Sequence, residues 1–197
     1  MRVIVRACLP VWYTKGFNPH AKLVFSTPLS VGAQSVCEYL DIRIDREMSC
    51  DEIKDRLNAE LTDELRITDA YFPKNDFLDI AYADYEILIH TSSLAPDTAE
   101  NIKSVLSHSP LMMVKKTKSG EKEIDIIPMI ASVNAELCGD NVMIRATLKA
   151  SSTEYLNPEL LISALREKCG ILSGNISEEW YTILRTAIRK ADLSIFE

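Results

Sequence analysis

Hydrophobic residues recur at four-residue steps shortly after residue 50, which is the spacing of one helix face. Ile53, Leu57 and Leu61 follow the run Ser49–Glu52. That run is a capping box, in which the serine and glutamate side chains can satisfy amides left free at a helix start. The pattern predicts a helix from Ser49 to about Leu61. The same reasoning predicts two further helices, one beginning at Pro96 and one running from the cap Asn157 and from Pro158 to Gly170.

Short apolar or alternating stretches between these helices predict strands. They cover residues 23–25, 39–44, 66–72, 85–90, 111–116, 123–127, 132–137, 142–148 and 180–188. Two of the connections read as hairpin turns, Lys118-Ser119-Gly120-Glu121 and Cys138-Gly139-Asp140-Asn141.

The order of the elements predicts an α+β fold built from two halves. Residues 84–189 read as strand, helix, a block of strands, helix and strand, which is a βαββαβ (ferredoxin-like) plan with an inserted β-hairpin. Residues 1–72 read as the same plan without its opening strand and most of its opening helix. We therefore expect two ferredoxin-like halves with antiparallel sheets, an N-terminally truncated one over 1–78 and a second over 79–197.

The net charge and the length of the apolar runs exclude some classes of protein. The 197 residues carry a net charge of −7, which argues against non-specific coating of nucleic acid. Residues 1–37 are the exception, with four basic residues and no acid: Arg2, Arg6, Lys15 and Lys22. No apolar run has the length of a membrane span, and the start is not a signal peptide, so we expect a cytoplasmic protein without membrane contact.

The segment Tyr13–Leu23 is the most distinctive part of the chain. Gly16, Phe17 and Pro19 shape a turn, and the Phe17 ring is expected to pin the loop to the core. Four polar side chains crowd the same loop and make it a candidate anion or RNA site. They are Lys15, Asn18, His20 and Lys22.

His20 is also a weak candidate for a catalytic proton donor. A lone histidine is more often a polar residue with a structural partner, so no catalytic residue is assigned.

A second basic stretch adds Lys116 and Lys118 as candidate RNA contacts. Either basic stretch alone is more commonly a solvated surface than a binding patch.

The sequence carries no motif for an iron–sulfur cluster, a zinc site or a nucleotide-binding loop. The five cysteines include no Cys-x-x-Cys pair and cannot supply the three closely spaced thiolates of a radical S-adenosylmethionine (SAM) cluster. The three histidines lack zinc-site spacing, and no glycine-rich nucleotide-binding motif is present. We therefore expect no metal and no cofactor in this chain.

The run from Leu9 to Phe25, with residues 28–32 and 38–42 after it, resembles the radical SAM-linked protein family, domain of unknown function 2344. Residues 116–128 and 157–161 are similar to later stretches of that family. The resemblance implies a bacterial-type accessory domain that works with a radical SAM protein. Similar members begin with a strand and a full helix before the Leu9 element, so we expect that Met1 is not the natural start or that the chain is a fragment.

Three hypotheses follow. The first is a non-catalytic accessory domain that docks on a radical SAM protein and contacts an RNA or another phosphate-bearing substrate. The second is a stand-alone enzyme that uses His20 and Lys22 at an anion site. The third is a purely structural interaction module that pairs a sheet edge with another chain. The oligomeric state is left open.

Overall fold

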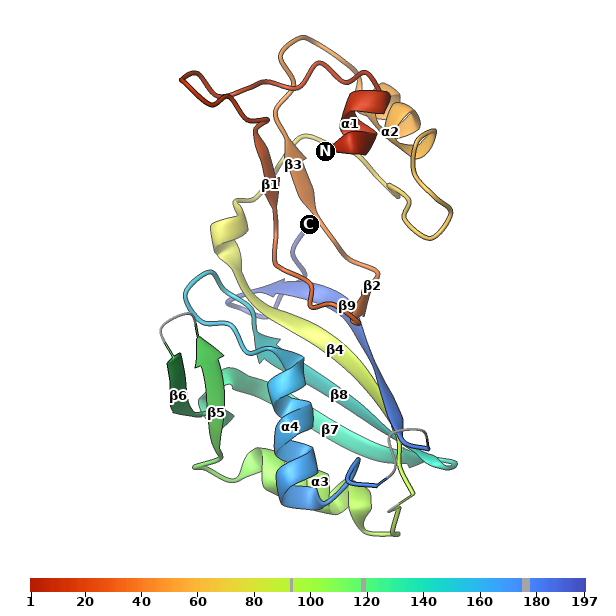
Figure 1. The fold of residues 1–197 in the computed structure, drawn as a ribbon, viewed down its shortest axis with the longest axis vertical. Coiled ribbons are helices and arrows are strands. Elements are labelled where there is room, and N and C mark those ends of the chain that lie inside the picture. Colours follow the sequence, from red (N-terminus) through yellow and green to blue (C-terminus); the bar gives the residue numbers. More distant parts are fainter. Residues whose placement is uncertain (93, 118–119, 175–177) are drawn as a thin grey trace. The chain divides into compact units, whose positions relative to one another are not determined.

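The computed structural model describes residues 1–92, 94–117, 120–174 and 178–197 as a mixed α+β fold with antiparallel sheets (Figure 1). It consists of two compact units. The first comprises Met1–Ser26 and Tyr39–Asp76, and the second comprises Thr27–Glu38 and Phe77–Glu197. The segment Thr27–Glu38 was predicted to belong to the first half, whereas in the structure it belongs to the second unit.

The first unit packs two helices against a pair of antiparallel strands. Its elements are α1 (Arg2–Arg6), β1 (Leu23–Phe25), β3 (Leu40–Ile42) and α2 (Cys50–Asn58). Its small core centres on side chains that precede β1 and on one from α2: Ile4, Ala7, Leu9, Val11 and Leu57. The predicted cap of α2 is confirmed, since the Ser49 hydroxyl accepts the Glu52 amide at 3.1 Å.

The strand predicted over residues 66–72 is wrong, because this segment has no strand pairing among the described residues. Instead, the amide and carbonyl of Ile67 bind the side chain of Asn58, at 2.8 and 3.0 Å. A side-chain amide at the end of α2 thus satisfies backbone groups that a neighbouring strand would otherwise pair.

The second unit is built on one five-stranded sheet. Its strands are β2 (Gln34–Ser35), β4 (Ile80–His90), β7 (Ile130–Cys138), β8 (Asn141–Lys149) and β9 (Trp180–Lys190), in the order β2-β9-β4-β8-β7. All neighbours are antiparallel except the short β2–β9 pair. The predicted strands that correspond to β4, β7, β8 and β9 are confirmed with longer bounds, and β2 was not predicted.

Two helices, α3 (Thr98–Ser107) and α4 (Pro158–Cys169), cover one face of this sheet (Figure 1). Between the helices and the sheet lie fully buried side chains such as Ile87, Ile102 and Leu161. The helix predicted to begin at Pro96 starts later, because the Thr98 hydroxyl accepts the Ala95 amide at 2.8 Å and closes a turn ahead of it.

The insertion between α3 and β7 is a separate hairpin of β5 (Met112–Thr117) and β6 (Gly120–Asp125). Both strands were predicted. The turn predicted over 118–121 falls partly on Lys118 and Ser119, which lie outside the described residues.

A buried arginine explains why Thr27–Glu38 belongs to the second unit. Arg185 on β9 donates to the Thr27 hydroxyl at 2.5 Å, the Pro28 carbonyl at 2.6 Å and the Glu38 carboxylate at 2.9 Å. Its side chain is only 1% exposed. One guanidinium group therefore holds both ends of the segment that contributes β2.

The cap of α4 offers a first test of the fold. The Asn157 side chain accepts the Glu159 amide at 3.1 Å and the Ser30 hydroxyl at 3.2 Å, and the helix ends at Gly170 with a φ of 67°. Because the cap would be lost, Asn157→Ala is expected to lower the free energy of unfolding by about 1 kcal/mol. Urea unfolding measures this change. A Ser163→Ala variant, altered on the exposed side of the same helix, should change it by less than about 0.5 kcal/mol.

Glu179 makes the stability of the folded protein depend on pH. Its carboxylate accepts the Thr91 hydroxyl at 2.5 Å, together with amides of Ser92 and Gly174. These hydrogen bonds, that from Thr91 foremost, hold the pKa of Glu179 below its ordinary value of 4.5. The stabilisation is therefore present above that value and is lost as the pH falls through the lower folded pKa.

We expect Glu179→Gln to destabilise the protein at pH 7 and to differ progressively less from the wild type below about pH 4. Thermal unfolding of both proteins between pH 7 and 3 measures the difference. A difference that stays constant with pH would contradict the assignment.

Within the described ranges, no helix combines the length and the apolar character needed to cross a membrane.

Candidate functional site

The predicted loop forms a short hairpin in the first unit, here called the basic hairpin, Trp12–Lys22. Tyr13 and Ala21 form an antiparallel bridge. The Thr14 amide donates to the His20 carbonyl at 2.9 Å, and the Lys22 amide donates to the Trp12 carbonyl at 2.9 Å. The tip turns through Gly16, whose φ of 139° favours glycine.

The Phe17 ring does not pin the hairpin to the core, contrary to the sequence expectation, because this residue is fully exposed. The neighbouring Asn18 and Pro19 are exposed as well. Thr14 holds the turn instead, through contacts across the hairpin. Its hydroxyl oxygen accepts the His20 amide at 3.0 Å and lies 3.1 Å from His20 Nδ1. A polar contact across the hairpin therefore holds the turn that an apolar contact was expected to hold.

The same contact orients the imidazole. The Thr14 hydroxyl accepts the His20 amide and lies within hydrogen-bonding distance of Nδ1, which fixes the orientation of the ring. His20 is exposed, so a ligand from solvent can reach Nε2.

Three chain segments meet at the base of the basic hairpin. The Trp12 amide donates to the Arg43 carbonyl at 2.8 Å, and the Arg43 amide donates to the Lys22 carbonyl at 3.2 Å. The guanidinium carbon of Arg43 lies 4.3 Å from the centre of the Trp12 ring, in a cation–π contact. Since paired residues on adjacent strands share a face, Lys22 is expected on the same side as this pair.

Sequence reasoning missed Trp12 and Arg43 as parts of this site. A signal existed for Arg43, which with Asp41 is one of the two charged residues in the alternating strand pattern of 39–44. Nothing in the sequence pairs it with Trp12, because the contact depends on how β3 meets the hairpin.

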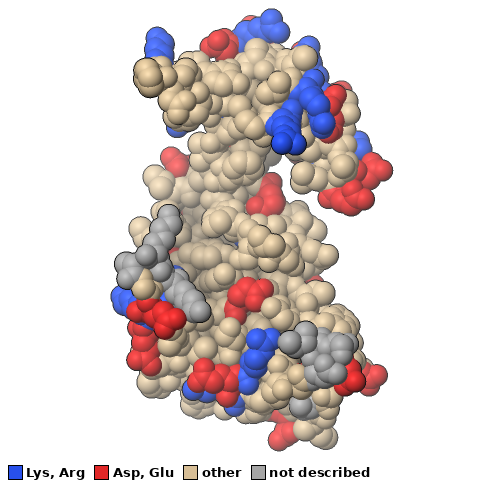
Figure 2. All heavy atoms as spheres, viewed as in Figure 1, with Lys and Arg blue, Asp and Glu red and all other residues tan. Residues whose placement is uncertain are grey.

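The cations of the basic hairpin and of the adjacent Arg43 are not neutralised. Lys15, Lys22 and Arg43 are exposed and form no ion pair within the described part of the chain. The first unit's ion pairs there involve other arginines and join Arg6 to Glu60, Arg56 to Glu52 and Arg66 to Asp63. Figure 2 shows exposed Lys and Arg side chains on both units, interspersed with Asp and Glu side chains.

The second predicted basic stretch belongs to the other unit and is not part of this site. Lys116 lies on β5 opposite Glu121, and neither its side chain nor Lys118 is described. The neighbouring Lys115 donates to the Tyr155 carbonyl at 3.0 Å. Lys116 and Lys118 therefore stay predictions.

Among the described residues, no group of three or more His, Cys, Asp or Glu side chains is placed to hold a metal ion.

Comparison with known proteins places the chain in a family. No curated protein and no solved structure matches it. A family described as an uncharacterised protein conserved in bacteria (DUF2344) matches residues 1–158, which is most of the chain. The chain therefore belongs to the DUF2344 family of uncharacterised proteins conserved in bacteria.

Proposed function

We propose that the chain is a non-catalytic accessory module whose basic hairpin contacts the phosphates of an RNA substrate handled by a radical SAM protein. The observation that carries the RNA contact is the cluster of exposed, unpaired cations around Trp12 in a chain of net charge −7. An acidic protein repels RNA overall, so binding would have to concentrate where cations are exposed and form no ion pair.

The chemistry of the basic hairpin suits a phosphate-bearing ligand. Lys22 and Arg43 supply charge, and Arg43 also offers several donors in a fixed plane for phosphate oxygens. His20 adds a further polar group at Nε2, on a ring that Thr14 orients. An arginine stacked on tryptophan gives a surface on which an unpaired base can stack.

The exposure of the site supports binding rather than catalysis. Enzyme sites exclude water around their reacting groups, whereas the His20 and Lys22 side chains are exposed. No described acid forms a hydrogen bond or an ion pair with His20 to orient it as a base. The competing enzyme hypothesis predicts that His20→Ala abolishes a turnover, whereas an accessory module keeps its partner's turnover largely intact.

The fold is proposed to consist of two ferredoxin-like halves. In the second unit, the support is the strand order β9-β4-β8-β7 with both helices on one face and the β5–β6 hairpin as an insertion. In the first unit, α1, β1, β3 and α2 follow one another as α3, β7, β8 and α4 do. A sheet of this kind is a frequent RNA platform, but fold alone does not assign function.

The radical SAM partner rests on the sequence resemblance. Its test is co-purification of the chain with a radical SAM protein from the same bacterium. If the two proteins migrate separately in size-exclusion chromatography at micromolar concentration, this part of the proposal fails.

Fluorescence anisotropy with a labelled transfer RNA tests the RNA contact. Lys22→Ala should weaken binding about fivefold, because one phosphate contact is lost. Lys103→Ala, which removes a partly exposed lysine paired with Glu100 on α3, serves as the control and should leave the affinity unchanged. Equal affinities for all three proteins would exclude the basic hairpin as the RNA contact.

A further inference from the structure

Phe17, at the tip of the basic hairpin, is fully exposed among the described residues. Single exposed apolar side chains are common on protein surfaces and by themselves indicate nothing. This ring differs in two respects, because a defined turn holds it and exposed cations lie on the same hairpin. Figure 1 shows that the hairpin, in the segment between α1 and β1, extends away from both helices of the first unit. The ring is therefore accessible to a ligand.

Hydrogen bonds across the hairpin fix the turn that presents Phe17. The Thr14 amide donates to the His20 carbonyl at 2.9 Å, and the Thr14 hydroxyl accepts the His20 amide at 3.0 Å. Within this closed turn, Gly16 has a φ of 139°, and the ring of Pro19 restricts its own backbone. Because the backbone on both sides of Phe17 is restrained, less conformational entropy is lost when its ring binds a ligand.

The charge around Phe17 indicates what kind of ligand its ring meets. Lys15 and Lys22 form no ion pair in the described part of the chain, and residues 1–37 contain no acid. In protein–protein interfaces, aromatic anchors lie in apolar centres from which lysine is depleted. Surfaces that bind single-stranded nucleic acid instead combine cations for the phosphates with aromatic rings for the bases. The basic hairpin has both, with Tyr13 as a second exposed ring, and so favours a nucleic acid over a protein.

The pairing of the bases decides whether such a ring has a surface to stack on. In an A-form RNA duplex the bases stack on one another, and side chains cannot read the deep and narrow major groove. In a loop or a single strand, each unpaired base offers a free face to an aromatic side chain. Unpaired RNA, and not a duplex, therefore gives the Phe17 ring a partner.

We propose that the basic hairpin selects unpaired RNA, with one base stacked on the Phe17 ring and nearby phosphates contacted by Lys15 and Lys22. This inference rests on the proposed function and adds the class of RNA, which is a loop or a single strand rather than a double helix. Phe17 determines this specificity, whereas the lysines supply affinity that carries no information about the bases.

Fluorescence anisotropy with two matched RNAs tests the selection. One is a fluorescein-labelled strand of about 12 nucleotides without self-complementarity, and the other is the same strand annealed to its complement. Charge alone favours the duplex, because its closely spaced phosphates release more counterions. We expect the opposite order, with the single strand bound at least about tenfold more tightly by the full chain.

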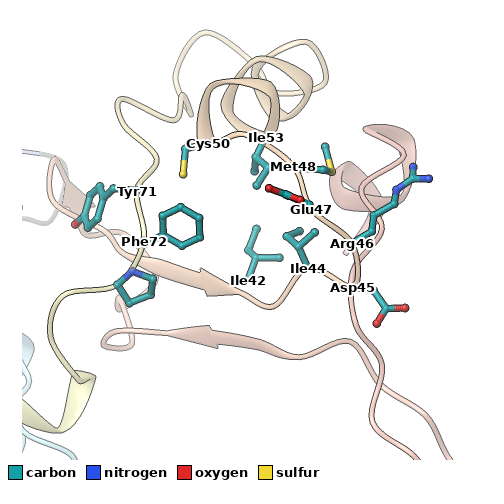
Figure 3. Close-up of a pocket in the computed structure, with 11 residues that line it drawn as sticks. Ile42, Ile44, Asp45, Arg46, Glu47, Met48, Cys50, Ile53, Tyr71 and Phe72 are labelled. Carbon is teal, nitrogen blue, oxygen red and sulfur yellow. The ribbon is translucent and has the colours of Figure 1, made fainter.

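Substitutions at Phe17 test whether its ring causes the preference. Phe17→Ala should weaken single-strand binding about tenfold and leave duplex binding unchanged, whereas Phe17→Tyr, which keeps a ring, should bind as the wild type does. Phe72→Ala is the control, because Phe72 is 80% exposed in the same unit but lines a separate pocket beside β3 and α2 (Figure 3). It should leave both affinities unchanged. Since Phe17 and Phe72 are exposed, all three variants should stay folded, which circular dichroism checks.

Photo-crosslinking gives an independent readout of the stacked base. 5-Iodouridine, placed in the single strand and irradiated, forms a covalent bond with an aromatic side chain that is stacked on it. Mass spectrometry should identify Phe17 as the main crosslinked residue. Crosslinks confined to residues outside the basic hairpin would overturn the inference.

The variants also separate this inference from the proposed function. Equal or tighter binding of the duplex, or unchanged single-strand binding by Phe17→Ala, overturns the selection of unpaired RNA. A loss of affinity for both RNAs in Lys22→Ala would then leave the phosphate contact intact. If neither RNA binds, or if Lys22→Ala changes nothing, the proposed function fails and the inference fails with it. If Phe17→Ala leaves RNA binding intact but abolishes co-purification with the radical SAM protein, the ring belongs to a protein contact.

Discussion

Arg185→Ala is expected to lower the free energy of unfolding by about 3 kcal/mol. The substitution removes a guanidinium group whose side chain is 1% exposed and leaves the Thr27 hydroxyl and the Pro28 carbonyl without their donor. Glu38 is 37% exposed, so water can solvate its carboxylate once the guanidinium group is gone. The expected loss of unfolding free energy therefore lies at the lower end of the range for a broken buried ion pair. Urea unfolding followed by circular dichroism measures the change.

Two variants separate the buried contacts from charge alone. Arg145→Ala removes an arginine that is 51% exposed and pairs with Glu86 and Glu136 on the same sheet, so it should cost less than about 1 kcal/mol. Arg185→Lys keeps the charge but not the forked geometry, and should lie between the two. Hydrogen exchange of Thr27–Glu38 should rise in Arg185→Ala. Equal costs for Arg185→Ala and Arg145→Ala would contradict the role given to Arg185.

Reversing both charges at the base of the basic hairpin should weaken transfer RNA binding about 100-fold. In the double variant Lys22→Glu and Arg43→Glu, two attractive contacts become repulsive, and the stack on Trp12 is lost. Fluorescence anisotropy at low salt measures the effect. Because both side chains are exposed, the variant is expected to unfold at nearly the wild-type temperature.

The control reverses two cations of the second unit, Lys103→Glu and Lys168→Glu, which pair with acids on α3 and α4. It changes the net charge by the same amount. A loss of affinity as large as that of the hairpin variant would show that total charge, and not the basic hairpin, governs binding.

Features that depend on nearby residues were predictable from the sequence. The cap at Ser49, and Asn157, Pro158 and Gly170 at the ends of α4, each act on backbone groups within a few positions, and each is confirmed. The turn at Gly16 is confirmed for the same reason.

Features that depend on distant partners were not predictable. Residues 66–72 have a strand-like sequence but form no strand, because a strand also needs a neighbour. The placement of Thr27–Glu38 depends on Arg185, far along the chain, inside a strand pattern that gives no sign of a buried charge. Likewise, Trp12 and Arg43 meet only through backbone pairing of separate segments.

The salt dependence of transfer RNA binding tests the central claim most directly. If Lys15, Lys22 and Arg43 each contact a phosphate, the logarithm of the association constant should fall against the logarithm of salt concentration with a slope of about −2 to −3. Lys22→Ala should make that slope shallower by about one. A flat salt dependence, or no binding at low ionic strength, would contradict a phosphate-contacting role for the basic hairpin.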